Sequence, residues 1–439
     1  MATAATPASE VPGPRLPAIA QTLLGVLRPV DARLRMRKRH GRVFRTHDAI
    51  AGEVFHVAAR DLVEQMFKWK PAQYRVGEPR EVMEPVTGPT SVLLLDGERH
   101  LRMRKLMLPP FHGTAIEHYA ELIEEITNRE IDGWRAGQTI RTRTVAQSIT
   151  MEVIIRAVFG VSDSGRVAAL RRDLPRLSSP NPLLLFMQKD LGPRSPWGRF
   201  LRLRDRVDRL LYDEIDERRA DPGRAERKDI LTLLLAARDE AGEPLSNGGL
   251  RDELITLLLA GHETTATSIG WAFERLLRTP AALERLTREV AAGESDAYLD
   301  AVVKETLRVR PVVAEVFRAP TEPTELGGYA FPAGAQLAAS IFLLQYDPEV
   351  YPPDPQAFRP ERFLDGAPEP YTWVPFGGGV RRCLGAAFAT LEMKVVIATM
   401  LRRARLRASR PRDESTRFRG VTFLPGRGGE AVVESVRRI

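Results

Sequence analysis

The chain has 439 residues and a formal net charge of +8, and 43% of its residues are hydrophobic. That length and composition allow a sizeable core in one large domain or two smaller ones, and a charged content of 28% excludes a bundle of membrane helices. The 65 basic and 57 acidic side chains are interleaved without a helix-turn-helix, zinc-finger or RNA-binding pattern. We therefore expect a solvated basic surface and no nucleic-acid partner.

Residues 1–20 contain four prolines by position 17 and no basic residue before Arg15. This composition predicts a loose, proline-rich lead and fits neither a signal peptide nor a membrane span. Apolar runs elsewhere in the chain are also too short to cross a membrane. A single cysteine excludes an internal disulfide, as is typical of a reducing compartment. We expect a soluble, cytoplasmic protein with no membrane span.

After the lead, residues 41–58 carry β-branched side chains and turn signals that predict a β-hairpin. Helical spacing dominates from about residue 117 to 279, interrupted by a proline-rich stretch at 178–200 that could form a flap or a plain connection. One uninterrupted helical pattern covers residues 250–278, which corresponds to a length of about 43 Å. Short helices, β-like pieces over 314–339 and a final helix with β-like segments complete the chain. The elements predict a mainly α fold with a small β portion.

The only cysteine, Cys383, lies in the stretch FGGGVRRCLG at residues 376–385. An isolated cysteine is usually a small buried hydrophobic residue. Here, however, Arg381 and Arg382 precede it and a helical pattern follows it, and both features favour the thiolate that binds metals. One cysteine without a paired Cys or His cannot build a zinc or iron–sulfur site, whereas a single protein thiolate suffices for haem iron.

The same stretch resembles the F-G-x-G-x-R-x-C-x-G signature of the cytochrome P-450 superfamily, the haem-thiolate monooxygenases. The positions that match the signature are Phe376, Gly377, Gly379, Arg381, Cys383 and Gly385. The resemblance covers nearly the whole chain and implies a single triangular domain over residues 21–439, with the long helix crossing the haem. It also implies haem b (iron protoporphyrin IX), with Cys383 as axial ligand and Phe376, Gly379 and Gly385 beside the cofactor.

Two further motifs agree with this resemblance. AGHETT, residues 260–265, is similar to the family's A/G-G-x-D/E-T-T, which implies that Ala260 borders the haem and that Glu263 and Thr264 are the acid–alcohol pair that delivers protons for dioxygen activation. KETLR, residues 304–308, resembles the family's E-x-x-R. Glu305 and Arg308 share a helical face, and a structural trio with Arg362 of the PERF segment is implied.

Four basic side chains are implied as partners of the haem propionates. His100 and Arg104 are four residues apart and lie on one helical face, as in the bacterial H-x-x-x-R form. Arg318 and Arg381 match the family's remaining propionate-binding arginines, and two carboxylates require positive donors of this kind.

The residues that line the substrate pocket are implied only by their position in the family pattern. These are Leu95, Leu257, Val312, Val313, Val316, Val421 and Phe423, within the wider segments 83–95, 178–200, 312–316 and 421–423. Their apolar character favours a lipophilic substrate of the fatty acid, terpenoid or steroid class. Glu315 is the polar exception, and we expect it to turn away into a hydrogen bond of the β region rather than to anchor the substrate.

The resemblance implies a monomeric enzyme that hydroxylates C–H bonds with O2. The chain contains no flavin or ferredoxin signature, so the electrons must reach it from a separate protein. These electrons would come from NAD(P)H through a reductase and a ferredoxin or flavodoxin-type donor. Arg102, Lys105 and Arg382 are candidates for a basic docking surface for that donor. A peroxide-driven peroxygenase and a non-catalytic haem sensor or carrier remain as alternatives. The substrate, the carbon attacked and the biological role stay open.

Overall fold

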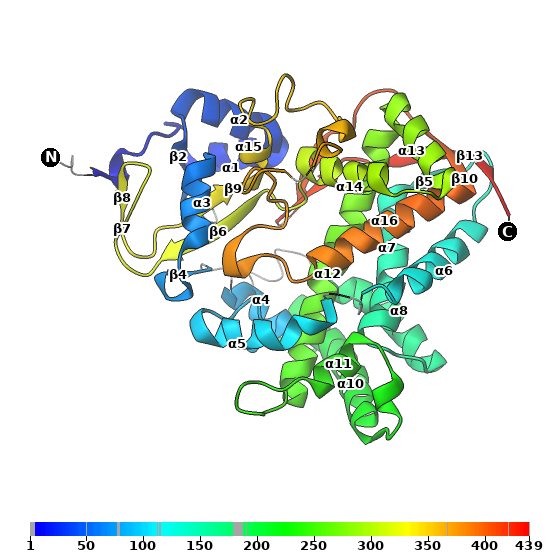
Figure 1. Ribbon diagram of the computed structural model, residues 1–439. Helices are drawn as coiled ribbons and strands as arrows, with labels where there is room; N and C mark the ends of the chain where they lie inside the picture. Colours follow the sequence, from blue (N-terminus) through cyan, green and yellow to red (C-terminus); the bar gives the residue numbers. More distant parts are fainter. Residues whose placement is uncertain are drawn as a thin grey trace.

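The structure is a computed structural model that describes residues 5–49, 51–76, 80–111, 113, 116–178, 188–189, 191–366, 368–419 and 421–438. Helices dominate these residues, and small sheets lie mostly toward the two ends of the sequence (Figure 1). The predicted fold class is therefore confirmed. The flap considered at residues 178–200 falls largely on residues 179–187 and 190, which lie outside the described residues.

The helices that precede the long central helix are α1 (Ala18–Leu27), α2 (Pro29–His40), α3 (Arg60–Lys68), α4 (Arg80–Thr87), α5 (Gly97–Met107), α6 (Tyr119–Asp132), α7 (Thr142–Val153), α8 (Ser164–Ser178), α10 (Pro196–Ala220) and α11 (Ile230–Ala236). The central helix and those that follow it are α12 (Asn247–Leu276), α13 (Pro280–Ala292), α14 (Ala297–Val309), α15 (Ile341–Gln345) and α16 (Ala386–Arg403). Among the described helices, none carries an apolar stretch of the length that a bilayer crossing requires.

The strands are β1 (Thr6–Pro7), β2 (Val43–Asp48), β3 (Gly52–Val57), β4 (Tyr74–Arg75), β5 (Thr139–Arg141), β6 (Glu315–Pro320), β7 (Thr324–Leu326), β8 (Tyr329–Phe331), β9 (Leu337–Ser340), β10 (Ala404–Ala408), β11 (Thr416–Arg419), β12 (Thr422–Pro425) and β13 (Glu430–Val436). The largest sheet has the order β2-β3-β9-β6-β4, and the predicted hairpin at residues 41–58 forms its β2–β3 pair. Smaller sheets pair β1-β8-β7, β10-β13-β5 and β11-β12. The main sheet and the helical bundle lie side by side (Figure 1).

Helix α12 is the axis of the helical part, and α7, α14 and α16 pack against it. It starts at Ser246, whose hydroxyl accepts a hydrogen bond from the Gly249 amide at 3.0 Å, and it ends before Pro280, which begins α13. Most of its side chains are buried, including Glu253 and Trp271. A helix that is buried over most of its surface can place side chains at the centre of the molecule.

The N-terminal lead is not loose as expected. Thr6 and Pro7 pair in parallel with Tyr329 and Ala330 of β8, and Val11 is 1% exposed in the core under the main sheet. A proline is tolerated in a strand at the edge of a sheet when its nitrogen, which has no N–H to donate, faces away from the neighbouring strand. The lead is therefore part of the folded domain from residue 5 onward.

Candidate functional site

The loop that carries Cys383 is shaped by its glycines. The Cys383 amide donates to the Phe376 carbonyl at 2.9 Å, and Gly379 has a φ of 65°, which favours glycine. A Cβ at Gly378 would lie 2.2 Å from the Phe67 ring of α3, and one at Gly379 would lie 2.2 Å from the Phe67 carbonyl oxygen. The missing side chains at Gly378 and Gly379 therefore make room for α3.

The Cys383 thiol is accessible to solvent although protein atoms surround it closely. Burial raises the pKa of Cys383, and the Gly385 amide and the charges of Arg104 and Arg382 oppose this shift without cancelling it. The expectation that neighbouring arginines hold a thiolate is therefore corrected for the protein alone, because desolvation costs more than these charges return. A bound metal cation would reverse the balance, since a coordinating thiol is deprotonated.

One face of α12 is accessible in the middle of an otherwise buried helix. Ala260 is exposed, and Leu257, Gly261 and Thr264 are half-buried, at a spacing that puts all four on one face. The residues on either side of this stretch, such as Leu254 and Ile269, are at most 1% exposed. The sequence of α12 thus leaves an internal surface open where the AGHETT motif lies.

The acid of that motif is held by α7. Glu263 forms an ion pair with Arg143, and its second oxygen accepts a hydrogen bond from the side-chain Nε2 of Gln147 at 2.8 Å. The Thr264 hydroxyl donates to the Ala260 carbonyl of its own helix. Glu263 and Thr264 are therefore adjacent, but in this structure their side chains have different partners. Sequence reasoning did not find Arg143 or Gln147, and no local signal marks them.

The neighbouring His262 is buried and makes a structural contact. Its Nδ1 lies 2.8 Å from the Thr150 hydroxyl of α7. Burial lowers the pKa of His262 to about 4, so the ring is neutral at pH 7. The side chain joins α12 to α7, and nothing in its contacts indicates a chemical role.

Arg318 is a buried cation that is only partly satisfied. The residue is 4% exposed, and its guanidinium stacks on Tyr74 at 4.6 Å from the ring centre. Its Nη1 donates to the Phe317 carbonyl at 2.8 Å, whereas its Nε has no hydrogen-bond partner among the described residues. Burial lowers the pKa of Arg318. A buried guanidinium with an unused donor calls for an anionic partner such as a carboxylate.

His100 and Arg104 lie on α5, and the charges of Arg381, Arg104 and Arg318 all act on His100. Burial, followed by these charges, lowers the pKa of His100 to about 3, so its ring is neutral at pH 7. Arg381, by contrast, already has partners: Asp96 at 2.7 Å and the carbonyls of Val92 and Leu95.

These residues fit haem. Cys383 offers one accessible thiol for the iron, and the open face of α12 would give a bound ring a largely apolar wall. Arg318 offers a buried donor to a propionate, beside His100 and Arg104. In the described residues, no group of three His, Cys, Asp or Glu side chains is arranged to hold a bare metal ion.

The implied trio is brought together. Arg308 pairs with Glu305 through two bonds of 2.6 and 2.8 Å, and both side chains are fully buried. Arg362 lies 3.7 Å from the same carboxylate. The two arginines also donate to the carbonyls of Pro352, Asp354, Pro355 and Ala357. The trio therefore fixes the segment that leads toward the Cys383 loop.

The proposed pocket segments approach one another across a long sequence separation. The Phe423 amide donates to the Val312 carbonyl at 2.8 Å, and Val313 pairs with Thr422. Phe423 itself is 2% exposed and packs on Phe342 and Phe418. Its ring therefore belongs to the core rather than to a pocket wall.

The other pocket candidates differ in exposure. Leu95 and Val312 are buried, Leu257, Val313 and Val316 are half-buried, and Val421 is 71% exposed. Glu315 has turned away as expected, because its carboxylate binds Arg33 and the His56 Nδ1, each at 3.0 Å. Burial alone would raise the pKa of Glu315, but the charge of Arg33 and the interactions with His56 outweigh it, and the pKa falls well below its ordinary value.

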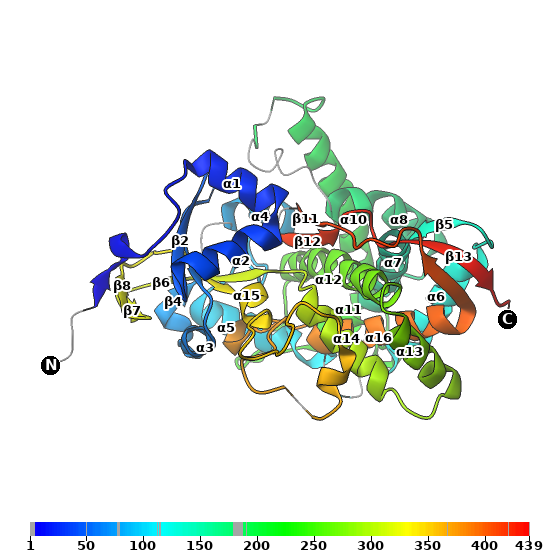
Figure 2. The same ribbon diagram turned by 90° about the horizontal axis from the view of Figure 1, so that it is seen from above.

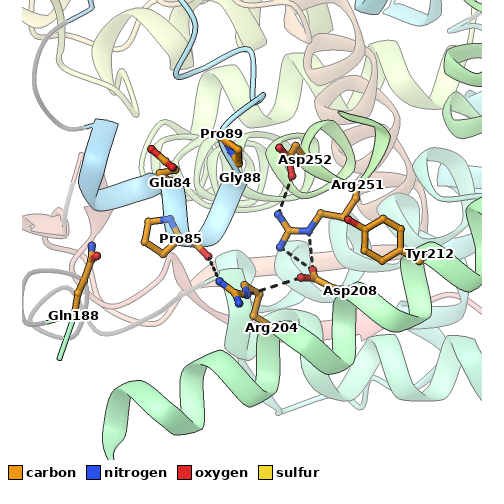
Figure 3. Close-up of a pocket in the computed structure, with 10 residues that line it drawn as sticks. All are labelled: Glu84, Pro85, Gly88, Pro89, Gln188, Arg204, Asp208, Tyr212, Arg251 and Asp252. Atoms are coloured by element: carbon orange, nitrogen blue, oxygen red, sulfur yellow. Dashed lines mark hydrogen bonds and ion pairs between the residues drawn. The ribbon is translucent and has the colours of Figure 1, made fainter. Parts of the chain in front are cut away.

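A separate cavity of about 550 Å³ lies between α4, α10 and the start of α12 (Figure 3). Its walls are polar: Arg251 bridges Asp208 and Asp252, and Arg204 donates to the Pro85 carbonyl at 3.3 Å. None of the seven individually predicted pocket residues lines it, although Glu84, Pro85, Gly88 and Pro89 belong to the predicted segment 83–95 and Gln188 belongs to the segment 178–200. Paired charges fill its walls, so its chemistry does not match a lipophilic substrate.

The basic docking surface is only partly present. Arg102 pairs with Asp239, and Lys105 pairs with Glu240 at 2.5 Å, in the loop before α12. Arg382 is exposed beside the cysteine. Two of the three cations expected to attract an acidic partner are therefore neutralised by acids of the same chain.

Comparisons with known proteins agree with this geometry. The family model described as Cytochrome P450 matches residues 12–428. A putative cytochrome P450 135B1 of Mycobacterium tuberculosis is 40% identical over 435 residues, covering 98% of this chain and 92% of the relative. A putative cytochrome P450 138 of the same organism is 39% identical over 403 residues, covering 91% and 90%.

Solved structures show the same fold. A retinoic acid-bound cyanobacterial CYP120A1 superposes with a TM-score of 0.80 at 25% identity, covering 98% of this chain and 99% of that one. The haem domain of a cytochrome P450DA superposes with a TM-score of 0.83 at 22% identity, covering 99% of each chain.

Proposed function

Because this chain belongs to the cytochrome P450 family of oxygen-incorporating oxidoreductases, we propose that it hydroxylates a C–H bond of a lipophilic small molecule. The observation that carries the proposal is the Cys383 thiol, accessible within a closely packed loop, in a protein whose central helix presents an open face. Bound haem supplies the activation of dioxygen, and the chain supplies the surroundings.

We assign the cofactor contacts by asking which side-chain donors are available to the haem propionates. Arg318 donates its unused Nε to a propionate, and His100 and Arg104 of α5 add further donors. Arg381 is held by Asp96, so its share in propionate binding requires an exchange of partners. Ala260, Phe376, Gly379 and Gly385 border the ring without a polar role.

Proton delivery is proposed for Glu263 and Thr264. The ion pair with Arg143 and the hydrogen bond from Gln147 fix the Glu263 carboxylate at the level of the open face. The Thr264 hydroxyl, bonded to the Ala260 carbonyl, is ready to pass a proton toward that face once it rotates. Release of Glu263 from Arg143 would let the carboxylate move toward the hydroxyl.

The substrate is proposed to be lipophilic because the half-buried candidates for its walls are apolar, namely Leu257, Val313 and Val316. The cyanobacterial relative binds retinoic acid, a lipophilic ligand of comparable kind. A fatty acid, terpenoid or steroid would suit such walls. Electrons are proposed to come from NAD(P)H through a reductase and a separate ferredoxin or flavodoxin. The enzyme is proposed to be a monomer.

The central test is the absorbance spectrum of the reduced carbon monoxide complex of the purified haem-loaded protein. A thiolate ligand shifts the Soret band strongly to the red, and we expect this band in the wild type and its loss in Cys383→Ser. Ser409→Ala, a substitution outside the site, serves as the control and should keep the band. Retention of the band in Cys383→Ser, or its absence from the wild type, would refute the proposal.

A second assay separates the alternatives. Product formed with NAD(P)H, reductase and ferredoxin supports the monooxygenase, whereas product formed with hydrogen peroxide alone supports a peroxygenase. If no lipophilic compound is consumed in either assay while the thiolate band is present, the sensor or carrier alternative is supported instead.

A further inference from the structure

Helix α1 turns its apolar face away from the protein. Ile19, Leu23 and Leu27 are spaced four residues apart, so they form one stripe, and they are 68, 53 and 73% exposed. Leu16, Leu24 and Val26 extend this stripe and are exposed as well. An amphipathic helix on a globular protein normally buries such a stripe, so this orientation needs an explanation.

Hydrogen bonds on the inner face fix the orientation. Gln21 is the buried residue of the helix. Its side-chain Nε2 donates to the Leu16 carbonyl at 2.7 Å, and its Oε1 accepts from the backbone amide of His47 at 2.9 Å. The Thr22 hydroxyl donates to Asp48 at 3.1 Å. Rotating the helix to bury its leucines would break these bonds to the end of β2. The outward stripe is therefore built into the fold.

Exposed cations flank the stripe in sequence and occur on the neighbouring helix α2. The exposed basic residues at the two ends of α1 and on α2 are Arg15, Arg28, Arg35, Lys38 and Arg39. In the described part of the chain, no ion pair joins any of these five to a carboxylate. Two other arginines of α2 do pair, but they point inward: Arg33 to Glu315 and Arg37 to Asp347. The carboxylates carried by α1, α2 and β2 are limited to Asp31 and Asp48.

The two helices lie side by side at the outer edge of the molecule, next to the main sheet (Figure 2). The stripe is the outward, convex face of a helix, and a convex apolar face needs a deformable partner rather than a matching groove. An interfacial helix of this kind sinks its apolar side into the boundary between headgroups and acyl chains, while nearby Arg and Lys attract anionic lipids.

We propose that the α1 stripe, with the cations of α2, is a docking surface for an anionic lipid bilayer. The protein lies on the bilayer surface and does not cross it. This inference goes beyond the proposed function, because it concerns binding by the outer surface and is tested without any turnover.

The test is sedimentation of the haem-loaded protein with vesicles of phosphatidylcholine, with and without phosphatidylglycerol. We expect binding to the mixed vesicles that weakens as salt is raised, and little binding to pure phosphatidylcholine. The double variant Leu23→Gln with Leu27→Gln should bind about tenfold more weakly, because the apolar area that enters the bilayer is lost. Arg35→Gln with Lys38→Gln should weaken the binding and its salt dependence.

Matched controls keep the result specific. Leu191 is 78% exposed outside the stripe, so Leu191→Gln should bind like the wild type. Arg209 and Arg405 are exposed arginines without an ion pair in the described residues. Changing both to Gln removes as much positive charge as the Arg35 and Lys38 changes and should leave binding as in the wild type. Thermal midpoints of all variants are compared, and a variant with an unchanged midpoint has kept its fold.

Three results would overturn the proposal. The first is the absence of wild-type binding to phosphatidylglycerol vesicles at low salt, and the second is binding that the Leu23 and Leu27 changes leave intact. The third is a concentration-dependent dimer in sedimentation velocity that the same two changes abolish, since the stripe would then be covered by a second copy of the chain.

Discussion

At the scale of single residues, some side chains of the site already have hydrogen-bond or ion-pair partners, whereas others have unused groups. Cys383 is accessible, Arg318 has an unused donor, and Glu263 is fully engaged by Arg143 and Gln147. A buried donor without a partner is costly, so Arg318 is pre-arranged for an anion. An engaged acid, in contrast, must change partners to move a proton.

This state of Glu263 leads to a prediction for turnover. Glu263→Gln removes the acid but keeps a side chain of the same size, and we expect the turnover rate to fall about a hundredfold, as is usual when a proton-transferring group is lost. The solvent deuterium isotope effect on NAD(P)H-supported turnover should rise, because proton delivery becomes the slow step. The measurement uses a compound that shifts the haem spectrum on binding.

Haem content and compound affinity are the controls, and both should match the wild type. Glu325, exposed on β7, provides a matched Glu→Gln substitution remote from α12 that should leave turnover unchanged. If Glu263→Gln kept turnover within about twofold with an unchanged isotope effect, Glu263 would have only a structural role with Arg143.

At the scale of elements, α14 and the segment after α15 are joined through one buried carboxylate. Glu305 binds Arg308 twice and also accepts from the Arg359 amide at 2.8 Å. The Trp373 indole donates to the Lys304 carbonyl at 3.0 Å, which ties the approach to the cysteine loop to the same helix. The position of the thiol therefore depends on contacts made far from it in sequence.

Glu305→Gln should be strongly destabilising. The change leaves the Arg308 guanidinium, which is fully buried, without its counter-charge, and breaking such a pair costs about 3–5 kcal/mol. The free energy of unfolding in urea measures this loss. Glu284 pairs with Arg288 at 4.0 Å on an exposed surface, so Glu284→Gln is a matched control without a measurable change. Equal effects of the two substitutions would contradict the structural role of the trio.

At the scale of the whole molecule, the core contains carboxylates that have no ion-pair partner among the described residues. Glu392 of α16 is 3% exposed and its Oε1 has no hydrogen-bond partner in the described residues. Burial raises the pKa of Glu392 to about 8. Glu253 of α12 is fully buried, and burial likewise raises its pKa to about 8, although the Val92 amide donates to it at 2.7 Å.

The raised pKa of Glu392 predicts a loss of stability with rising pH. The folded state keeps a proton up to about pH 8, whereas the unfolded chain releases it near pH 4.5, so the folded state is progressively disfavoured between these values. Glu392→Gln removes this penalty. Its thermal midpoint relative to wild type should therefore be higher at pH 9 than at pH 5. Glu325→Gln should show no such pH dependence, and an equal difference at both pH values would contradict the prediction.

The sequence alone determined the helical fold, the hairpin at residues 41–58, the long central helix and the family to which Cys383 and its neighbours belong. These follow from local periodicity and from a motif of fixed spacing, which do not require knowledge of distant contacts. The E-x-x-R pair is local in the same sense, because three residues along a helix place Glu305 and Arg308 on one face.

Only the tertiary structure decided which partner each charged side chain has. Glu263 meets Arg143, Arg381 meets Asp96, and Arg102 meets Asp239 across separations of 120, 285 and 137 residues along the chain. It also placed the leading strand β1 beside β8 and turned the apolar side of α1 outward. Periodicity shows that a helix has two faces, but packing against the rest of the chain determines which face is buried.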